Sequence, residues 1–165
     1  MDLQHFWGTD YDLNPPLTED ALHHAEQFLG VEFPRDLVAL WEVQNGGYTQ
    51  GFVFPTRQRT SWAEDHVPLN ELFGIGSPAV PSGIHNVLNA KYMIVEWGLP
   101  SNQVLLAGDG HWWITLDYRN NAEPRVTWFD VEVGEDIELA SSFRQFLSGL
   151  LPNSAIDDET CRLIK

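Results

Sequence analysis

The segment from residue 103 to residue 130 constrains the fold more than any other part of the chain. It contains an apolar run at 103–107, an alternating stretch at 111–118 and a third run at 125–130. A Gly-Asp-Gly turn separates the first two, and a polar loop separates the last two. Connections this short join antiparallel strands, because a parallel connection needs a crossover of about a dozen residues or more. The pattern therefore predicts three strands in an antiparallel meander.

The tryptophans divide into expected core residues and candidates for exposure. Successive side chains of a strand point to opposite faces, so Trp112 and Trp113 lie on opposite sides of the predicted sheet. Trp112 falls on the apolar face and is expected in the core, together with Trp41 and Trp97. Trp113 is either exposed or covered by a helix, and Trp62 lies in a polar loop where exposure is expected.

Helical periodicity precedes the meander. Thr18 is expected to cap a helix over residues 19–29, which Gly30 ends in a left-handed conformation. Pro34 suits the first turn of a second helix, which the Asn-Gly-Gly sequence at 45–47 stops. The sequence therefore predicts two consecutive helices in its first third.

Two more helices are expected later in the chain. Residues 89–97 have helical spacing and are followed by Gly and Pro, although a strand at 92–95 is an alternative. Ser141 or Ser142 is expected to cap a last helix that contains Phe143.

The remaining segments complete an α+β fold. Short strands are expected at 51–55 and 66–73, and residues 131–138 are expected to form an acidic connection. The whole chain, residues 1–165, is expected to be one domain in which helices cover the sheet. An extended lead-in at 1–16 and a tail at 152–165 flank it.

Composition narrows the class of partner. Nine basic and 24 acidic residues give a net charge of 9 − 24 = −15, which repels nucleic acid and anionic membranes and attracts basic proteins. The chain has no secretory leader pattern and no apolar run long enough to cross a membrane. Its one cysteine, Cys161, fits a reducing compartment, so we expect a cytoplasmic protein.

The residue types that carry catalysis do not form a recognisable motif. His23 and His24 are helix neighbours that point about 100° apart, so they cannot share one metal ion well. No nucleophile elbow and no phosphate-binding loop occurs. We expect no enzyme activity, no cofactor and no metal. A small hydrolase or metal enzyme is the alternative, which a stoichiometric transition metal bound through His111 would support.

A protein-docking surface is the remaining expectation. Exposed tryptophan beside acidic groups is typical of anchors at protein interfaces. The candidate contacts are acidic or aromatic residues on predicted loops and on the sheet face that is open if no helix covers it. They are Glu64, Asp65, Asp109, Trp113, Glu135 and Asp136.

An ordered series of short motifs resembles the SUKH superfamily. The stretch 25–34 contains a Glu near the end of the first helix, then Leu-Gly and Phe-Pro, and Asn-Gly-Gly follows the second helix at 45–47. Similar motifs continue at 96–100, 108–112, 116–119 and 142–147. The resemblance runs from about Leu17 to Leu150.

The resemblance implies a fold and a function. It implies a twisted, mainly antiparallel sheet with helices packed against it. Many bacterial members are immunity proteins that bind and neutralise a toxin, often a nuclease, whereas fungal members regulate cell-wall assembly through protein partners. We expect an immunity protein that binds a basic cognate toxin stoichiometrically; a partner-binding regulator or scaffold without a toxin is the alternative.

Overall fold

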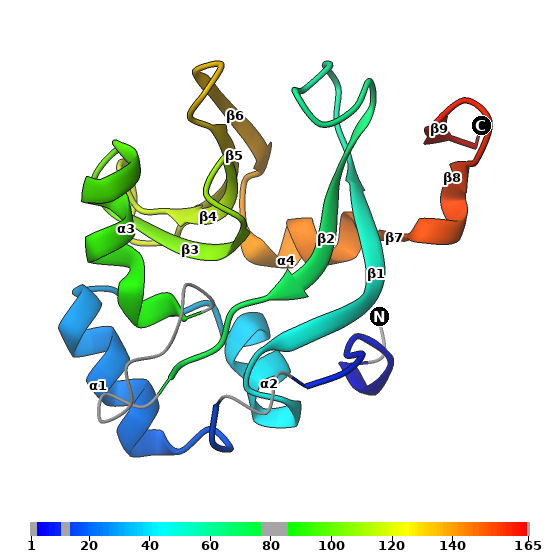
Figure 1. The fold of residues 1–165 in the computed structure, drawn as a ribbon. Coiled ribbons are helices and arrows are strands. Elements are labelled where there is room, and N and C mark those ends of the chain that lie inside the picture. The colour runs from blue at the N-terminus through cyan, green and yellow to red at the C-terminus, as the bar shows by residue number, and fades with distance from the viewer. Residues whose placement is uncertain (1–2, 11–13, 77–85, 165) are drawn as a thin grey trace.

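The computed structural model describes residues 3–10, 14–76 and 86–164 of the chain. These residues form an α+β fold of helices and antiparallel sheets (Figure 1). The α-helices are α1 (Glu19–Leu29), α2 (Arg35–Val43), α3 (Ala90–Trp97) and α4 (Phe143–Gly149). The strands are β1 (Gly47–Pro55), β2 (His66–Leu72), β3 (Gln103–Gly108), β4 (Trp112–Asp117), β5 (Arg125–Asp130), β6 (Glu135–Ala140), β7 (Leu151–Pro152), β8 (Ile156–Asp157) and β9 (Arg162–Leu163). Short 3-10 helices are η1 (Leu3–His5), η2 (Val87–Asn89) and η3 (Asn153–Ala155).

The predicted meander is confirmed and is one strand longer than expected. β3, β4, β5 and β6 form a four-stranded antiparallel sheet in that order. The acidic segment that was expected to be a connection supplies β6, because its side chains alternate between half-buried and exposed positions. β1 pairs with β2 and β7 in a second sheet, and the backbone N–H of Phe73 donates to Leu106 O at 2.6 Å between the two sheets.

The predicted helices are confirmed, and the ends of α1 are built as the sequence indicates. Thr18 Oγ1 accepts a hydrogen bond from the Ala21 N–H at 3.2 Å, and Gly30 closes α1 in the left-handed conformation with φ 73°. α3 is a helix, so the alternative of a strand at 92–95 is wrong. None of the helices in the described ranges has both the length and the apolar character required to cross a bilayer.

The two ends of the chain are more ordered than a lead-in and a tail. Phe6 and Trp7 are buried, and Trp7 Nε1 donates to Leu40 O at 3.0 Å, so these two residues are anchored in the core. Near the other end, β7 extends the β1–β2 sheet, and β8 pairs with β9 in a small hairpin. Large apolar side chains explain the first anchor, since burying each one removes its surface from water.

The expected burial in the core is wrong for Trp97 and only partly met by Trp112, whereas both alternatives were open for Trp113. Trp113 is fully buried, because Phe73 packs edge-on against it and Gly108, its register partner, leaves room for its ring. Trp97 is 37% exposed, because it packs against the β3–β4 turn beside His111 instead of entering the core. Trp112 is only partly buried and packs against the core. Trp41 is fully buried as predicted.

Candidate protein-docking surface

Three connections between strands meet at one end of the sheets. Asp130, at the end of β5, is the register partner of both Trp112 and Glu135, so the β3–β4 turn (109–111) and the β5–β6 turn (131–134) lie at the same end. The β1–β2 loop (56–65) joins them, because the Ser61 N–H donates to Glu135 Oε2 at 3.0 Å. Figure 1 shows the β1–β2 loop and the β5–β6 turn extending in the same direction. We call residues 56–65, 109–112 and 131–135 the turn-end surface.

Each connection is shaped by a side chain that accepts hydrogen bonds from the backbone. Asp130 Oδ1 accepts from the N–H groups of Glu132 and Val133 at 2.9 and 3.2 Å. Asp109 Oδ1 accepts from the His111 N–H at 3.1 Å, and Thr60 Oγ1 accepts from the Trp62 N–H at 3.2 Å. Such bonds are the reason why Asp and Thr favour turns. They fix the loops that carry the exposed side chains.

Three tryptophans from different elements stack at this surface. The Trp112 and Trp128 rings lie nearly parallel, with centroids 5.0 Å apart and an interplanar angle of 12°. Trp62 meets Trp112 edge-on at 5.7 Å. Trp128 is buried, whereas Trp62 is 49% exposed, so the stack extends from the core to solvent. The expected exposure of Trp62 is confirmed.

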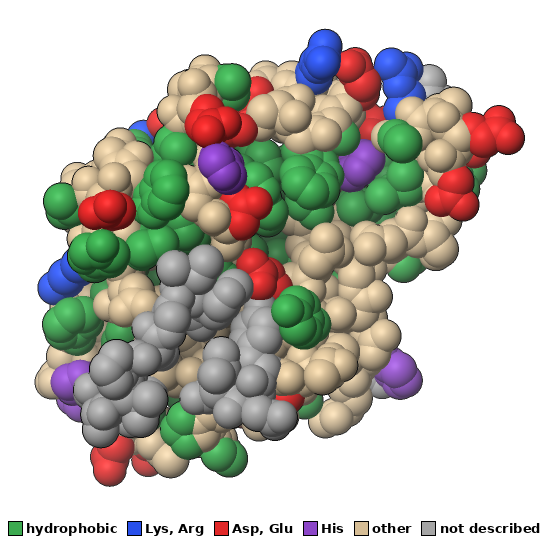
Figure 2. Space-filling model, viewed as in Figure 1, with side chains coloured by type: hydrophobic (Ala, Val, Ile, Leu, Met, Phe, Trp, Pro, Cys, Tyr) green, Lys and Arg blue, Asp and Glu red, His purple; other side chains and the backbone are tan. Residues whose placement is uncertain are grey.

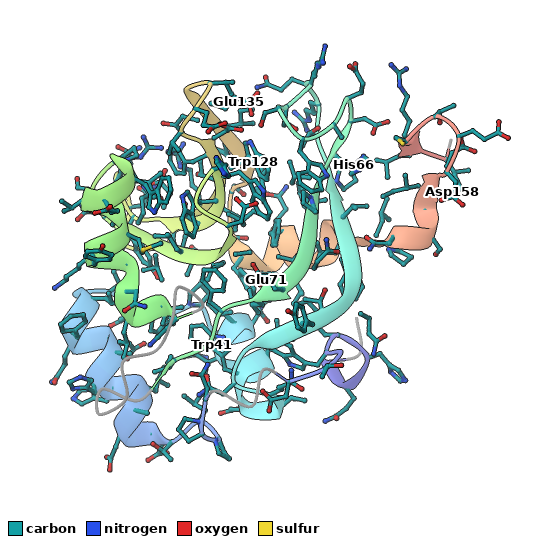
Figure 3. All side chains as sticks on the ribbon, viewed as in Figure 1. Trp41, His66, Glu71, Trp128, Glu135 and Asp158 are labelled. Atoms are coloured by element: carbon teal, nitrogen blue, oxygen red, sulfur yellow. The ribbon has the colours of Figure 1, made fainter. Side chains whose placement is uncertain are left out.

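Glu135 links the stack to the β1–β2 loop. Its Oε2 accepts from Trp128 Nε1 at 2.9 Å and from the Ser61 N–H at 3.0 Å. Figure 3 shows Glu135 at the start of β6 with Trp128 beside it, on the side that faces β2. A carboxylate that accepts two N–H bonds is held in one orientation. The half-buried Glu135 therefore contributes to the geometry of the surface as well as to its charge.

Acidic side chains and histidine border the aromatic stack. His111 Nδ1 lies 2.8 Å from Glu132 Oε1, and its ring lies beside that of Trp97 at 6.4 Å. Figure 2 shows hydrophobic side chains in the hollow between the sheets, with acidic and histidine side chains around it. Within the described ranges, no three His, Cys, Asp or Glu side chains converge in a metal-binding arrangement. The surface has the composition of an interface: aromatic in its centre and charged at its rim.

Asp136 and Trp113 do not belong to the turn-end surface. Adjacent residues of β6 point to opposite faces, so Glu135 faces Trp128 while Asp136 faces Arg119. Arg119 donates to Asp136 from both terminal nitrogens, at 2.7 and 2.9 Å. Trp113 is buried on that second face, so it cannot contact a partner in this conformation. The predicted contact residues therefore do not all lie on one surface, because Asp136 and Trp113 face away from Glu135.

Glu64 and Asp65 lie at the edge of the β1–β2 loop and contact the C-terminal hairpin. Glu64 forms ion pairs with Arg59 at 3.2 Å and with Arg162 at 3.6 Å. Asp65 lies 3.0 Å from His66 Nδ1 and accepts from the Leu163 N–H at 3.2 Å. The hydrogen bond with His66 lowers the pKa of Asp65, against the opposing effect of burial. Asp65 holds the hairpin in place, whereas Glu64 and Asp109 are exposed on the turn-end surface.

The largest polar groups around a second hollow are engaged in the fold. This hollow, about 490 Å³, is lined by α1, α3 and the segment after β4, including Lys91 and Tyr118. Lys91 Nζ donates to Phe28 O, and Tyr118 OH donates to Glu32 O at 2.7 Å. Burial raises the pKa of the Tyr118 hydroxyl, and the nearby carboxylates of Glu26 and Glu32 raise it further. The Tyr118 hydroxyl is therefore not poised to transfer a proton near neutral pH.

Sequence reasoning missed the Trp112–Trp128 stack and the role of Glu135 within it. The polar setting of Trp62 was a usable signal, because it indicated an exposed ring on a loop. The stack itself depends on contacts between residues 50 positions apart (Trp62 and Trp112), for which the sequence has no local pattern.

Comparison with known proteins identifies one family. The model of the SMI1 / KNR4 family (SUKH-1) matches residues 16–149, which is most of the chain and confirms the resemblance found in the motifs. A search of curated proteins found no match to this sequence. The matched region includes all three connections of the turn-end surface.

Proposed function

Because the chain belongs to the SMI1 / KNR4 family (SUKH-1), we propose that it is a cytoplasmic immunity protein that binds and neutralises a basic cognate toxin. The family is generally non-catalytic, and binding to a protein partner is the activity that family membership favours. The observation that carries the proposal is the turn-end surface, where exposed tryptophan is bordered by carboxylates on a chain of net charge −15. Inhibition is stoichiometric, by covering the toxin's active or substrate-binding surface.

Charge supports a nuclease as the toxin. A nuclease has to be basic where it holds phosphates, and an acidic inhibitor is complementary to that region. Long-range attraction between opposite charges raises the association rate and weakens as salt screens it. We therefore expect association with the toxin to slow steeply with added salt, while dissociation changes much less.

The first experiment is co-expression with the toxin candidate encoded beside the gene. An immunity protein restores growth, and the two chains then co-purify in a 1:1 complex. A chain that rescues cells from none of the adjacent toxin candidates is not an immunity protein, and the partner-binding regulator then becomes the better hypothesis.

The second experiment tests the surface with matched charge changes. Asp109 and Glu132 are exposed on the turn-end surface, and Glu19 and Glu42 are exposed on α1 and α2. The double variant Asp109→Asn/Glu132→Gln should slow association with the toxin about 3- to 10-fold at low salt. Glu19→Gln/Glu42→Gln has the same net charge change and should slow association less than about twofold. Equal effects of the two variants would mean that overall charge, and not this surface, guides binding.

A further inference from the structure

The tryptophan stack is a preformed platform, because its inner members are fixed by the fold. Trp128 is buried and its Nε1–H is bonded to Glu135, and Trp112 lies parallel against it at 5.0 Å. Trp62 is the outermost ring, at 5.7 Å from Trp112, and about half of its surface is exposed. An aromatic group that is already ordered loses little conformational entropy when a partner binds to it.

The carboxylate beside the platform has one oxygen that the fold does not use. Both hydrogen bonds to Glu135 end on Oε2, one from Trp128 and one from Ser61. Among the described residues, no donor contacts the other oxygen, Oε1. The negative charge is therefore fixed next to the rings and keeps an acceptor for a further N–H donor.

The cations of the described chain do not occupy this platform. The cation–π contacts among the described residues are Lys91 over Phe28 and Arg119 over Phe129, both away from the stack. Arg59, in the same loop as Trp62, is paired with Glu64 at 3.2 Å. The exposed part of the Trp62 ring and the Glu135 carboxylate beside the stack are thus available for a cation that comes from another molecule.

We propose that the Trp62–Trp112 platform and Glu135 receive an arginine side chain of the basic partner, an inference that rests on the proposed function. The planar guanidinium stacks on indole and donates from several N–H groups at once, so it can contact the rings and Glu135 Oε1 together. A lysine ammonium is a point charge and matches only one of these features at a time. Arginine and tryptophan are also the residue types that dominate interface energies.

A short peptide tests this without the toxin. The probes are hexa-arginine and hexa-lysine, titrated by calorimetry into the full chain at a salt concentration that screens non-specific attraction. The wild-type protein should bind hexa-arginine more tightly than hexa-lysine. Trp62→Ala should weaken hexa-arginine binding about fivefold and remove the preference for arginine. The control is Tyr92→Ala, which removes an aromatic ring that is 64% exposed on α3 and should leave both affinities unchanged.

A second variant keeps the test valid if Trp62→Ala disturbs the loop. Glu135→Gln retains an oxygen that can accept from Trp128 and Ser61 but removes the charge, and should also weaken hexa-arginine binding about threefold or more. Equal wild-type affinities for the two peptides, or unchanged hexa-arginine binding in both variants, would overturn the proposal.

The toxin assay separates this inference from the proposed function. If the wild type protects cells and Trp62→Ala protects with equal affinity for the toxin, the arginine site is wrong and the immunity function stands. If the wild type fails to protect, the immunity function is wrong, and the peptide result alone decides whether the arginine site exists.

Discussion

The buried carboxylate of Asp117 provides the strongest prediction about stability. Asp117 is 2% exposed and accepts from Arg119 through the backbone N at 2.9 Å and Nη2 at 2.8 Å. Arg125 Nη2 donates to it at 2.9 Å, and Gln103 Nε2 donates at 2.8 Å. Each arginine also pairs with an acidic residue of β6, so this network joins β3, β4, β5 and β6. The perturbation is Asp117→Asn.

The structure indicates the size of the loss. Asn keeps one acceptor oxygen, and its amide group then replaces Oδ2, which accepts from both Arg119 Nη2 and Arg125 Nη2. Two charge-assisted hydrogen bonds are lost, each worth about 1.5–3 kcal/mol, and donors then face donors. Removing one partner of a buried ion pair costs about 3–5 kcal/mol. We expect the free energy of unfolding at pH 7 to fall by about that amount.

The same network predicts a pH dependence. Burial alone would raise the pKa of Asp117, but the hydrogen bonds from Arg119, Gln103 and Arg125 outweigh it and hold that pKa well below its usual range. A carboxyl with a lowered folded-state pKa stabilises the protein above its unfolded pKa, about 3.9, and this contribution is lost as pH falls toward the folded value. The difference between wild type and Asp117→Asn should therefore shrink below about pH 4, by up to about 1.4 kcal/mol per pH unit.

Urea unfolding followed by tryptophan fluorescence measures both effects. The matched control is Asp36→Asn, which neutralises the half-buried partner of the exposed Arg144 and should cost less than about 1 kcal/mol. A loss of under about 1 kcal/mol for Asp117→Asn, or a difference that stays constant from pH 5 to pH 2.5, would refute the reasoning.

Two further predictions concern backbone geometry and the C-terminal hairpin. Gly108→Ala should lower the free energy of unfolding by roughly 2–5 kcal/mol, since Gly108 has φ 146° and its new Cβ would lie 2.3 Å from Trp112 O. Gly134→Ala has positive φ but open space around it and should cost about 1–2 kcal/mol in the same thermal or urea measurement. Asp65→Ala should speed amide exchange of Leu163 about tenfold or more, because its carboxylate acceptor is removed. Asp158→Ala should leave that amide unchanged; equal acceleration in both variants would show that the bond to Asp65 does not hold the hairpin.

Short sequence patterns predict the helices and strands that depend only on residues close together in the chain. Thr18 and Gly30 bound α1 because capping depends on residues a few positions apart. The meander followed from three apolar stretches joined by short turns. In β4, the alternation of side chains predicts that Trp112 and Trp113 lie on opposite faces of the sheet, which is correct. How exposed each ring is depends on which elements cover its face, and both faces of β4 are largely covered.

Contacts between distant residues explain what the sequence could not indicate. Trp7 donates to Leu40 across 33 positions, so short-range patterns place Trp7 in an extended lead-in although it is buried in the core. Glu135 and Asp136 were grouped as neighbours in an acidic segment, whereas β6 sends them to opposite faces with different partners. The tryptophan stack likewise forms only when the β1–β2 loop folds against the four-stranded sheet.

Hydrogen–deuterium exchange of the toxin complex, compared with the free protein, tests the central claim most directly. The account predicts protection of backbone amides in the β1–β2 loop (56–65) and in the β5–β6 turn (131–134), which carry the turn-end surface. Protection confined to the exposed faces of α1 and α3, with no change in these two connections, would contradict it.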